Sequence, residues 1–383
     1  MSQSSKMLHI VREGAGLGYP CGLARLADLL GACENVREHV LLLGTMNLLR
    51  EAEELDIEGA ERLAAPFGSG IAGYRTLKKK LKQLGSIDVI SCDEIGVLWS
   101  LEKLQKNARK ILWMEDVPQA GRKLNWLRKY LTGKGKNKAN IVVSCEALKQ
   151  QLTKANLSSD SIKVLGVGAG INRSKLSQTD ILSARQRWGV AEGATNYVVG
   201  ILSDHPDRVD VRTISLASGT VDQVLKIEVE NWNMRVLLSQ HHAHRSRATH
   251  LTSEFGYAGL LVQEAGCGRP WEVVQECDAL VVLGEQSVLS LAWACKSGKP
   301  VLAENWASLS ELCEGGNEGV ILFDKDDLRK PAAKLTEWYK QPEERKIASE
   351  AAVKLGKKCF TAQAMRQRFA THLKDLLKSS NLG

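Results

Sequence analysis

One stretch of the chain, residues 277–324, places a buried strand, a helix, a tight turn and a second strand in direct succession. The run 279–283 is short, apolar and partly β-branched, and Gly284 ends it. These features are typical of a strand buried on both faces of a parallel sheet. Residues 286–296 suit a crossover helix, and a right-handed crossover would make the next strand, at 301–303, parallel to the first. The stretch therefore predicts half of a doubly wound α/β domain.

The helix expected after Gly284 would begin at the carboxyl end of that sheet. At a helix start, backbone N–H groups have no partner within the helix, and the helix dipole is positive. We therefore expect residues 285–287 to form a seat for a diphosphate.

The rest of the chain also alternates short apolar runs with amphipathic segments, which favours parallel sheets throughout. A glycine-rich loop at 14–22 follows the first run and leads into a helix at 23–30. Its glycines suit either a close approach of ligand to backbone or a turn with positive φ, and both interpretations stay open. The remaining expected strands are 7–11, 40–43, 88–90, 110–113, 140–143, 197–202, 236–239 and 260–262.

Length and composition exclude several classes of protein. A chain of 383 residues exceeds the size at which one core usually divides, roughly 250–300 residues, so we expect two domains. No apolar run approaches the ~20 residues that span a bilayer, and the start lacks the apolar core of a signal peptide, so we expect a cytoplasmic protein.

Cysteine and histidine spacing argues against a metal site. The nine cysteines are scattered without a close pair, which indicates neither a disulfide framework nor a zinc site. Four histidines crowd into residues 241–250, but no cysteine or carboxylate accompanies them at ligand spacing. We interpret this segment as a polar surface loop and expect no metal.

Basic residues concentrate between 121 and 139, where seven lysines and arginines alternate with Trp126, Tyr130 and leucines, without an acid. This pattern suits either a solvated helix face or peripheral contact with the inner, anionic face of a membrane. The net charge of +8 raises nucleic acid as a third partner, but no recognition motif accompanies the charge, so we expect none.

Several motifs, taken in their order, resemble GT-B glycosyltransferases of family 4, a retaining group. In that family an Ala-Asp strand precedes a glutamate-bearing loop, a Glu-Ala-Met-Ala helix and a Gly-x-Pro-Val strand, and residues 277–303 are similar. Cys21-Gly-Leu-Ala-Arg25 resembles the family's Gly-Gly-x-x-Arg loop. Further similar segments lie at 141–144, 170–172, 311–314 and 319–324. Each motif alone could occur in any Rossmann-like fold, and it is their order that makes the resemblance specific to this family.

The resemblance implies a GT-B fold, which consists of two Rossmann-like, doubly wound parallel-sheet domains. Residues 1–173 would form the acceptor-side domain, residues 174–360 would bind the nucleotide sugar, and 361–383 would be a helix that packs back on the first domain. The implied reaction transfers a sugar from a nucleotide-sugar donor, the co-substrate, to an acceptor that the sequence does not name. The family's lipid-linked acceptors keep membrane contact open, and no metal or other cofactor is implied.

The resemblance also implies roles for individual residues. Glu285 falls on the first of two family glutamates and would contact the donor sugar as the catalytic residue. The other donor-binding residues would be Gly284, Gln286, Ser287, Val288, Arg208 and Glu311. The acceptor-side loop would hold Gly14, Gly16, Gly18 and Gly22.

The chain departs from the family at other donor positions. Trp293 replaces the second glutamate, and Ile201 and Pro206 replace an arginine and a lysine. The family's histidine-bearing segments resemble 88–93 and 113–116, which contain no histidine. These departures favour an alternative, a catalytically silent GT-B protein that binds a sugar, lipid or partner. A Rossmann oxidoreductase is a third interpretation, weakened by the lack of the Gly-x-Gly-x-x-Gly fingerprint.

Overall fold

The chain forms two compact units. Unit 1 comprises Met1–Gly168 and Ala362–Gly383, and unit 2 comprises Ala169–Thr361. The sequence predicted divisions at residues 173 and 360. The computed structural model describes residues 5–12, 21–33, 35–44, 46–63, 71–118, 121–132, 138–170, 183, 185–190, 192–204, 209–238, 253–254, 260–263, 274–285, 287–313 and 319–378.

Unit 1 is built on a parallel sheet of seven strands in the part of the chain that the structure describes, in the order β3-β2-β1-β4-β5-β6-β7. The strands alternate along the chain with helices, as expected for right-handed crossovers. The strands are β1 (Ser5–Arg12), β2 (Val36–Leu43), β3 (Ala60–Leu63), β4 (Val89–Cys92), β5 (Arg109–Trp113), β6 (Asn140–Val143) and β7 (Ile162–Val164). The helices are α1 (Cys21–Leu29), α2 (Met46–Glu54), α3 (Ile71–Leu84), α4 (Ile95–Leu104), α5 (Arg122–Thr132), α6 (Glu146–Lys154) and α15 (Ala362–Lys378), with a short 3₁₀ turn, η1 (Ser159–Ser161).

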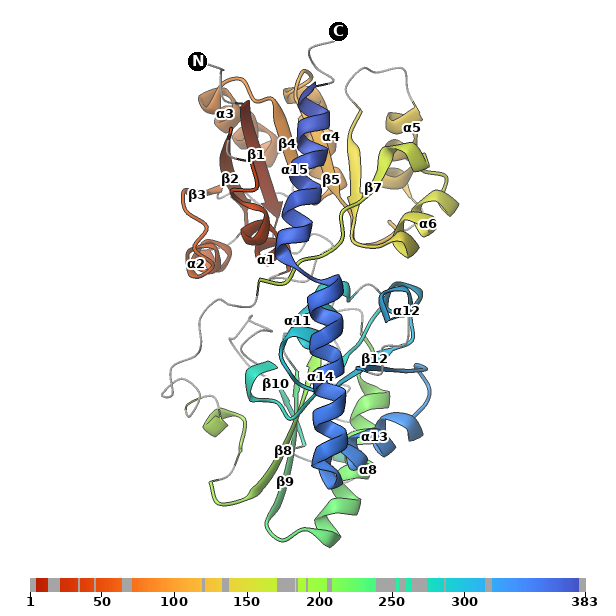
Figure 1. Cartoon of the computed structure of the whole chain (residues 1–383). Coiled ribbons are helices and arrows are strands. Elements are labelled where there is room, and N and C mark those ends of the chain that lie inside the picture. Colours follow the sequence, from red (N-terminus) through yellow and green to blue (C-terminus); the bar gives the residue numbers. More distant parts are fainter. Residues whose placement is uncertain are drawn as a thin grey trace. The chain divides into compact units, whose positions relative to one another are not determined.

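The last helix of the chain, α15, completes the core of unit 1. Figure 1 shows it lying along one face of the unit 1 sheet. Its buried residues Met365, Phe369 and Leu373 recur at the spacing of one helix face and pack in one cluster with strand residues such as Met7 and Ile111. Burying such apolar side chains contributes about 1.5–3 kcal/mol each.

Unit 2 is built on a second parallel sheet, with six strands among the described residues, in the order β10-β9-β8-β11-β12-β13. The strands are β8 (Thr195–Leu202), β9 (Trp232–Leu238), β10 (Leu261–Gln263), β11 (Ala279–Val282), β12 (Val301–Glu304) and β13 (Val320–Phe323). The helices are α8 (Arg212–Glu228), α11 (Val288–Lys296), α12 (Ala307–Cys313), α13 (Arg329–Lys340) and α14 (Pro342–Cys359).

The strand order of each sheet reverses at one place. In unit 1 the chain moves from β1 to β2 and β3 on one side, then returns to β4 on the other side of β1. In unit 2 the same reversal lies between β8 and β11. In open α/β sheets, ligands bind at the carboxyl ends of the strands at such a switch point. Each unit therefore has one switch point at which a ligand is expected to bind.

The predicted fold class, two Rossmann-like parallel-sheet domains with a final helix, is confirmed. The strand at 140–143 has the predicted bounds. The predicted loop at 14–22 is wrong at its end, because α1 begins at Cys21 and includes Gly22. Glycine in a helix interior costs about 1 kcal/mol relative to alanine. Gly22 lies in the first turn, where fewer helical hydrogen bonds hold the backbone, so the cost there is smaller. The predicted start of a helix at 286 is also wrong, because α11 begins at Val288.

Candidate functional site

The switch point of unit 2 brings together polar residues from three strand ends. Ser203 and Asp204 follow β8, Gly284, Glu285 and Ser287 follow β11, and Glu304 is the last residue of β12. Because parallel strands end at the same side of a sheet, these residues meet at its carboxyl end. This cluster is the candidate donor site.

Gly284 turns the chain sharply as it leaves β11. Its φ is +97°, a backbone conformation that only glycine adopts readily, and a Cβ there would lie 2.9 Å from Cγ2 of Val209. The Gly284 N–H donates to Oε2 of Glu304 at 2.8 Å, and the same oxygen accepts the indole N–H of Trp306 at 2.7 Å. Glu304 therefore fixes the path of the turn that carries Glu285.

Glu285 lies at the exposed tip of this turn. Its backbone carbonyl accepts a hydrogen bond from the hydroxyl of Ser308 on α12. The backbone of Glu285 is therefore anchored, while its side chain is exposed. Glu311 lies on the same short helix, α12, and is half-buried.

Asp204 lies at the start of α11, next to Ser287 of the predicted diphosphate seat. Its carboxylate accepts the N–H of Leu289 at 2.9 Å on one oxygen, and the N–H of Ser290 at 2.8 Å and its hydroxyl at 2.5 Å on the other. Asp204 is 3% exposed, so a buried carboxylate caps the first turn of α11. The N–H groups of Leu289 and Ser290 are therefore not available to a diphosphate, and the predicted seat at 285–287 stays a prediction.

Ser287 links this carboxylate to the β11 turn. Its hydroxyl donates to the carbonyl of Leu283 at 2.5 Å and accepts the N–H of Asp204 at 3.1 Å. The side chains of Ser287 and Val288 are buried, so a ligand would meet the backbone here. Of the other predicted donor residues, Gln286 and Arg208 lie outside the described residues, as do Gly14, Gly16 and Gly18 of the predicted acceptor loop.

Two positions where the chain differs from the resembling family, Trp293 and Ile201, lie in the core of unit 2. Trp293 is 3% exposed on α11, whose residues from Val288 to Cys295 are all buried. Ile201 is buried within β8, and Pro206 lies outside the described residues. A ribose cannot reach a side chain at position 293 without opening this core.

Two residues that shape the site, Asp204 and Glu304, were not predicted. Glu304 directly follows a run of apolar strand residues, and Asp204 follows such a run with Ser203 between them. This position is the one signal that the sequence offers for either residue. A polar residue at a strand end is common, so this signal alone selects neither residue.

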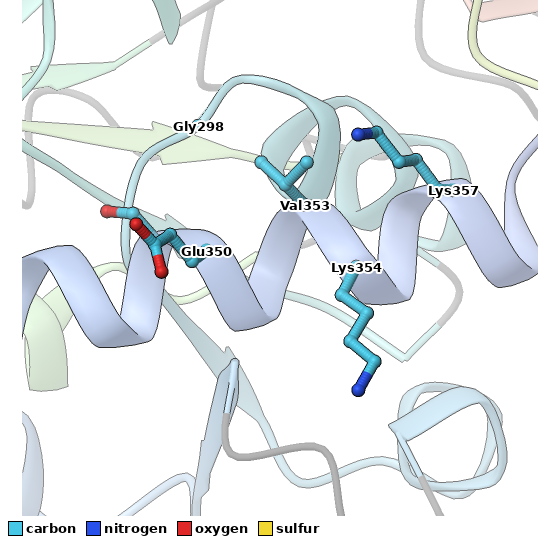
Figure 2. Close-up of a pocket in the computed structure, with 6 residues that line it drawn as sticks. Gly298, Glu350, Val353, Lys354 and Lys357 are labelled. Carbon is cyan, nitrogen blue, oxygen red and sulfur yellow. The ribbon is translucent and has the colours of Figure 1, made fainter.

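A surface groove of about 420 Å³ lies elsewhere in unit 2. It is bounded by the Gly298 turn and by Ser349, Glu350, Val353, Lys354 and Lys357 of α14. The Gly298 turn precedes β12, so the groove lies at the amino end of that strand. Figure 2 shows Lys354 and Lys357 leaving α14 in different directions, so they do not converge on a common anion. The groove is therefore a poor candidate for a donor site.

Metal-binding clusters and membrane-spanning helices are two further features that bear on function. Within the described residues, no three or more histidine, cysteine, aspartate or glutamate side chains gather as metal ligands would. The histidine segment 241–250 lies outside those residues. Among the described helices, none combines the length and the apolar character that a membrane span requires.

Comparison with known proteins identifies the fold. Two Rossmann-like parallel-sheet domains followed by a final helix define the GT-B class. The structure is similar to a glycosyltransferase from Rickettsia africae ESF-5, with a TM-score of 0.73 and 15% identity over 98% of this chain and 99% of that one. It is similar to Anabaena Alr3699/HepE solved with UDP and glucose, with a TM-score of 0.73 and 18% identity over 97% and 100% of the two chains.

A third solved structure agrees with these two. WaaG, a glycosyltransferase involved in lipopolysaccharide biosynthesis, has a TM-score of 0.64 and 13% identity over 95% of this chain and 98% of that one. No family model and no curated protein matches the sequence. At these identities, the likeness establishes the GT-B fold over nearly the whole chain.

Proposed function

We propose that this protein transfers a sugar from a nucleotide-sugar donor to an acceptor hydroxyl. The observation that supports the proposal is the exposed Glu285 at the unit 2 switch point, on a turn anchored by hydrogen bonds to Glu304 and Ser308. Ligands of open α/β sheets commonly bind at such a switch point. A GT-B structure similar over nearly the whole chain, Anabaena Alr3699/HepE, was solved with UDP and glucose. That similarity supports UDP as the first nucleotide to test.

In this proposal Glu285 contacts the donor sugar. The backbone of Gly284, Gln286, Ser287 and Val288 lies along the nucleotide, with Arg208 and Glu311 as further contacts. Asp204 accepts hydrogen bonds from the N–H groups of Leu289 and Ser290, so these groups are not available to the diphosphate. In this proposal the diphosphate instead contacts the turn after Gly284 and Arg208.

The proposed chemistry breaks the bond between the anomeric carbon and the diphosphate oxygen. The acceptor oxygen bonds to that carbon, and the diphosphate leaves with the electron pair. Gly14, Gly16 and Gly18, together with Gly22 in the first turn of α1, would lie on the acceptor side. The nucleotide sugar is a co-substrate, and we propose that the chemistry uses no metal or other cofactor, because dipoles and cations can stabilise the leaving group.

Replacing Glu285 by glutamine tests this function. A lost electrostatic contact in the transition state typically costs ~3 kcal/mol, so we expect donor turnover to fall about 100-fold while nucleotide affinity stays within about threefold. Calorimetry with UDP, GDP and ADP would measure affinity, and release of free sugar from the matching nucleotide sugar would measure turnover. Glu350→Gln, on the exposed groove of α14, is the matched control.

The same measurements separate the proposal from its alternative. Turnover by Glu285→Gln at the wild-type rate would exclude the proposed role of Glu285. A wild-type protein that binds a nucleotide but consumes no nucleotide sugar would instead favour the catalytically silent GT-B protein.

We further propose that unit 1 contacts an anionic membrane through α5. Trp99 of α4 is 41% exposed and stacks on Trp126 at 5.6 Å, and Trp126 stacks on Tyr130 at 5.0 Å. Arg122 and Lys129 are exposed on the same helix, α5. Aromatic rings beside cations suit the interface of an anionic bilayer.

The double variant Arg122→Gln/Lys129→Gln tests this contact. Each cation near an anionic surface contributes about 1 kcal/mol, so we expect binding to fall roughly 30-fold. Co-sedimentation with phosphatidylcholine vesicles containing phosphatidylglycerol would measure it. Lys226→Gln/Lys346→Gln removes the same charge from exposed positions of unit 2 and should have little effect. Equal loss in both variants would indicate only nonspecific attraction.

A further inference from the structure

Two buried acidic residues of unit 2 are bonded to the turn that follows β11. Glu304 is 5% exposed, and Asp204 is 3% exposed. Oε2 of Glu304 accepts the Gly284 N–H at 2.8 Å, and the backbone N–H of Asp204 donates to the Ser287 hydroxyl at 3.1 Å. One acidic residue is therefore attached to each end of the turn, and both belong to the same unit as the turn.

Both carboxylates are surrounded by hydrogen-bond donors. Asp204 accepts the N–H of Leu289 and both the N–H and the hydroxyl of Ser290. Glu304 accepts two hydrogen bonds on one oxygen, from the Gly284 N–H and from the indole N–H of Trp306. Such donors suit an ionised carboxylate, which can only accept hydrogen bonds. The protein thus places two negative charges of its own at this switch point.

These charges lie close to where the proposed function puts the diphosphate. In that proposal the diphosphate contacts the turn after Gly284, and hydrogen bonds of 2.8 and 3.1 Å join this turn to the two acidic residues. Like charges at such short range repel each other, more strongly in a partly buried site than in water. The more negative of two nucleotides should therefore bind less well here.

We propose that Asp204 and Glu304 determine specificity by charge, so that the site binds a nucleotide sugar more tightly than the free nucleoside diphosphate. This inference rests on the proposed transferase function and names the form of the nucleotide that the site retains. In the nucleotide sugar, the terminal phosphate is esterified on both sides and carries a single negative charge. In the free diphosphate it is a monoester, which carries about −1.5 to −2 at pH 7.

The same difference in charge gives the two residues a part in product release. When the bond between the anomeric carbon and the diphosphate oxygen breaks, the electron pair stays on the diphosphate. The nucleotide therefore becomes more negative at the moment when it becomes the product. Repulsion by Asp204 and Glu304 then favours its departure and its replacement by a new donor molecule.

The test is calorimetry of the full chain with three matched pairs of ligands: UDP-glucose and UDP, GDP-mannose and GDP, ADP-glucose and ADP. For the pair that binds, we expect the wild type to bind the nucleotide sugar about tenfold more tightly than the diphosphate. Glu304→Gln removes a charge, and its amide oxygen can still accept both hydrogen bonds of Oε2. This variant and Asp204→Asn should each reduce the ratio to about threefold. The ratio is compared because damage to the fold would weaken both ligands alike.

Two controls separate this effect from general electrostatics. Asp278→Asn removes a charge at the amino end of β11, where that carboxylate accepts the Val198 N–H, and should leave the ratio unchanged. Raising the salt concentration should lower the wild-type ratio, because salt screens the repulsion in part. This measurement and Glu304→Gln also decide the question if Asp204→Asn does not fold.

Each outcome decides between the two proposals. Ratios in Glu304→Gln and Asp204→Asn that equal the wild-type ratio would overturn the charge preference, as would a wild type that binds the free diphosphate more tightly. The transferase function would survive that result if the donor is still consumed. A wild type with the expected ratios that consumes no donor would overturn the transferase function alone. A wild type that binds none of the six ligands would overturn both.

Discussion

Asp204→Ala is expected to lower the free energy of unfolding by about 3 kcal/mol. The substitution removes a buried carboxylate that accepts three hydrogen bonds from Leu289 and Ser290. Two backbone N–H groups would then lie buried without a partner, and loss of a helix cap alone costs ~1 kcal/mol. Urea denaturation followed by tryptophan fluorescence would measure the loss. A loss below about 1 kcal/mol would mean that water replaces the carboxylate.

Asp204→Asn separates the charge of this residue from its shape. The amide can still accept one N–H bond, but it brings no negative charge to the helix start. If a nucleoside diphosphate binds beside α11, its affinity should rise about tenfold, because repulsion worth ~1 kcal/mol or more is removed. Calorimetry would measure the change. Asp278→Asn is the control, since that carboxylate accepts the Val198 N–H at 2.9 Å at the amino end of β11, away from α11. Unchanged affinity in Asp204→Asn would place the diphosphate away from α11.

Gly319→Ala is expected to destabilise unit 2 by about 3 kcal/mol. A Cβ at this position would lie 2.1 Å from the backbone nitrogen of Ala352 and 2.2 Å from the carbonyl carbon of Ala351. Both atoms belong to the backbone of α14, which cannot rotate away as a side chain can. The strand β13 would have to separate from the helix, and overpacking of this kind typically costs 1–3 kcal/mol.

Gly193→Ala is the matched control for this substitution. Gly193 has a φ of +76°, and nothing lies within 4 Å of its would-be Cβ. Its replacement should cost only the penalty for a left-handed backbone, about 1–2 kcal/mol. Thermal and urea unfolding would compare the two variants. Equal losses would mean that α14 moves easily away from β13.

Short apolar runs in the sequence predicted most of the strands, although β13, which is apolar throughout, was not among them. β6 and β11 are short, buried runs, and the sequence predicts them closely. β3 was not predicted, because two of its four residues, Glu61 and Arg62, are charged. A strand at the end of a sheet is paired on one side only, so it tolerates such residues.

Less of the candidate site than of the fold could be predicted from the sequence. Gly284 was predictable because a strand that ends in glycine favours a sharp turn. The cap of α11 was not, because it joins Asp204 to Ser290 across 86 positions of the chain. A contact of that kind depends on the order of strands in the sheet, which local patterns do not specify.

The return of α15 to unit 1 has a consequence for how the chain folds as it is synthesised. Met365, Phe369 and Leu373 supply part of the unit 1 core, yet they follow all of unit 2 in the chain. Unit 2 is continuous, so it can fold as soon as it leaves the ribosome. The first unit to be translated is the last to be completed, and until then an apolar face of its sheet lacks its cover. A newly made chain therefore has its greatest risk of aggregation in the part that was made first.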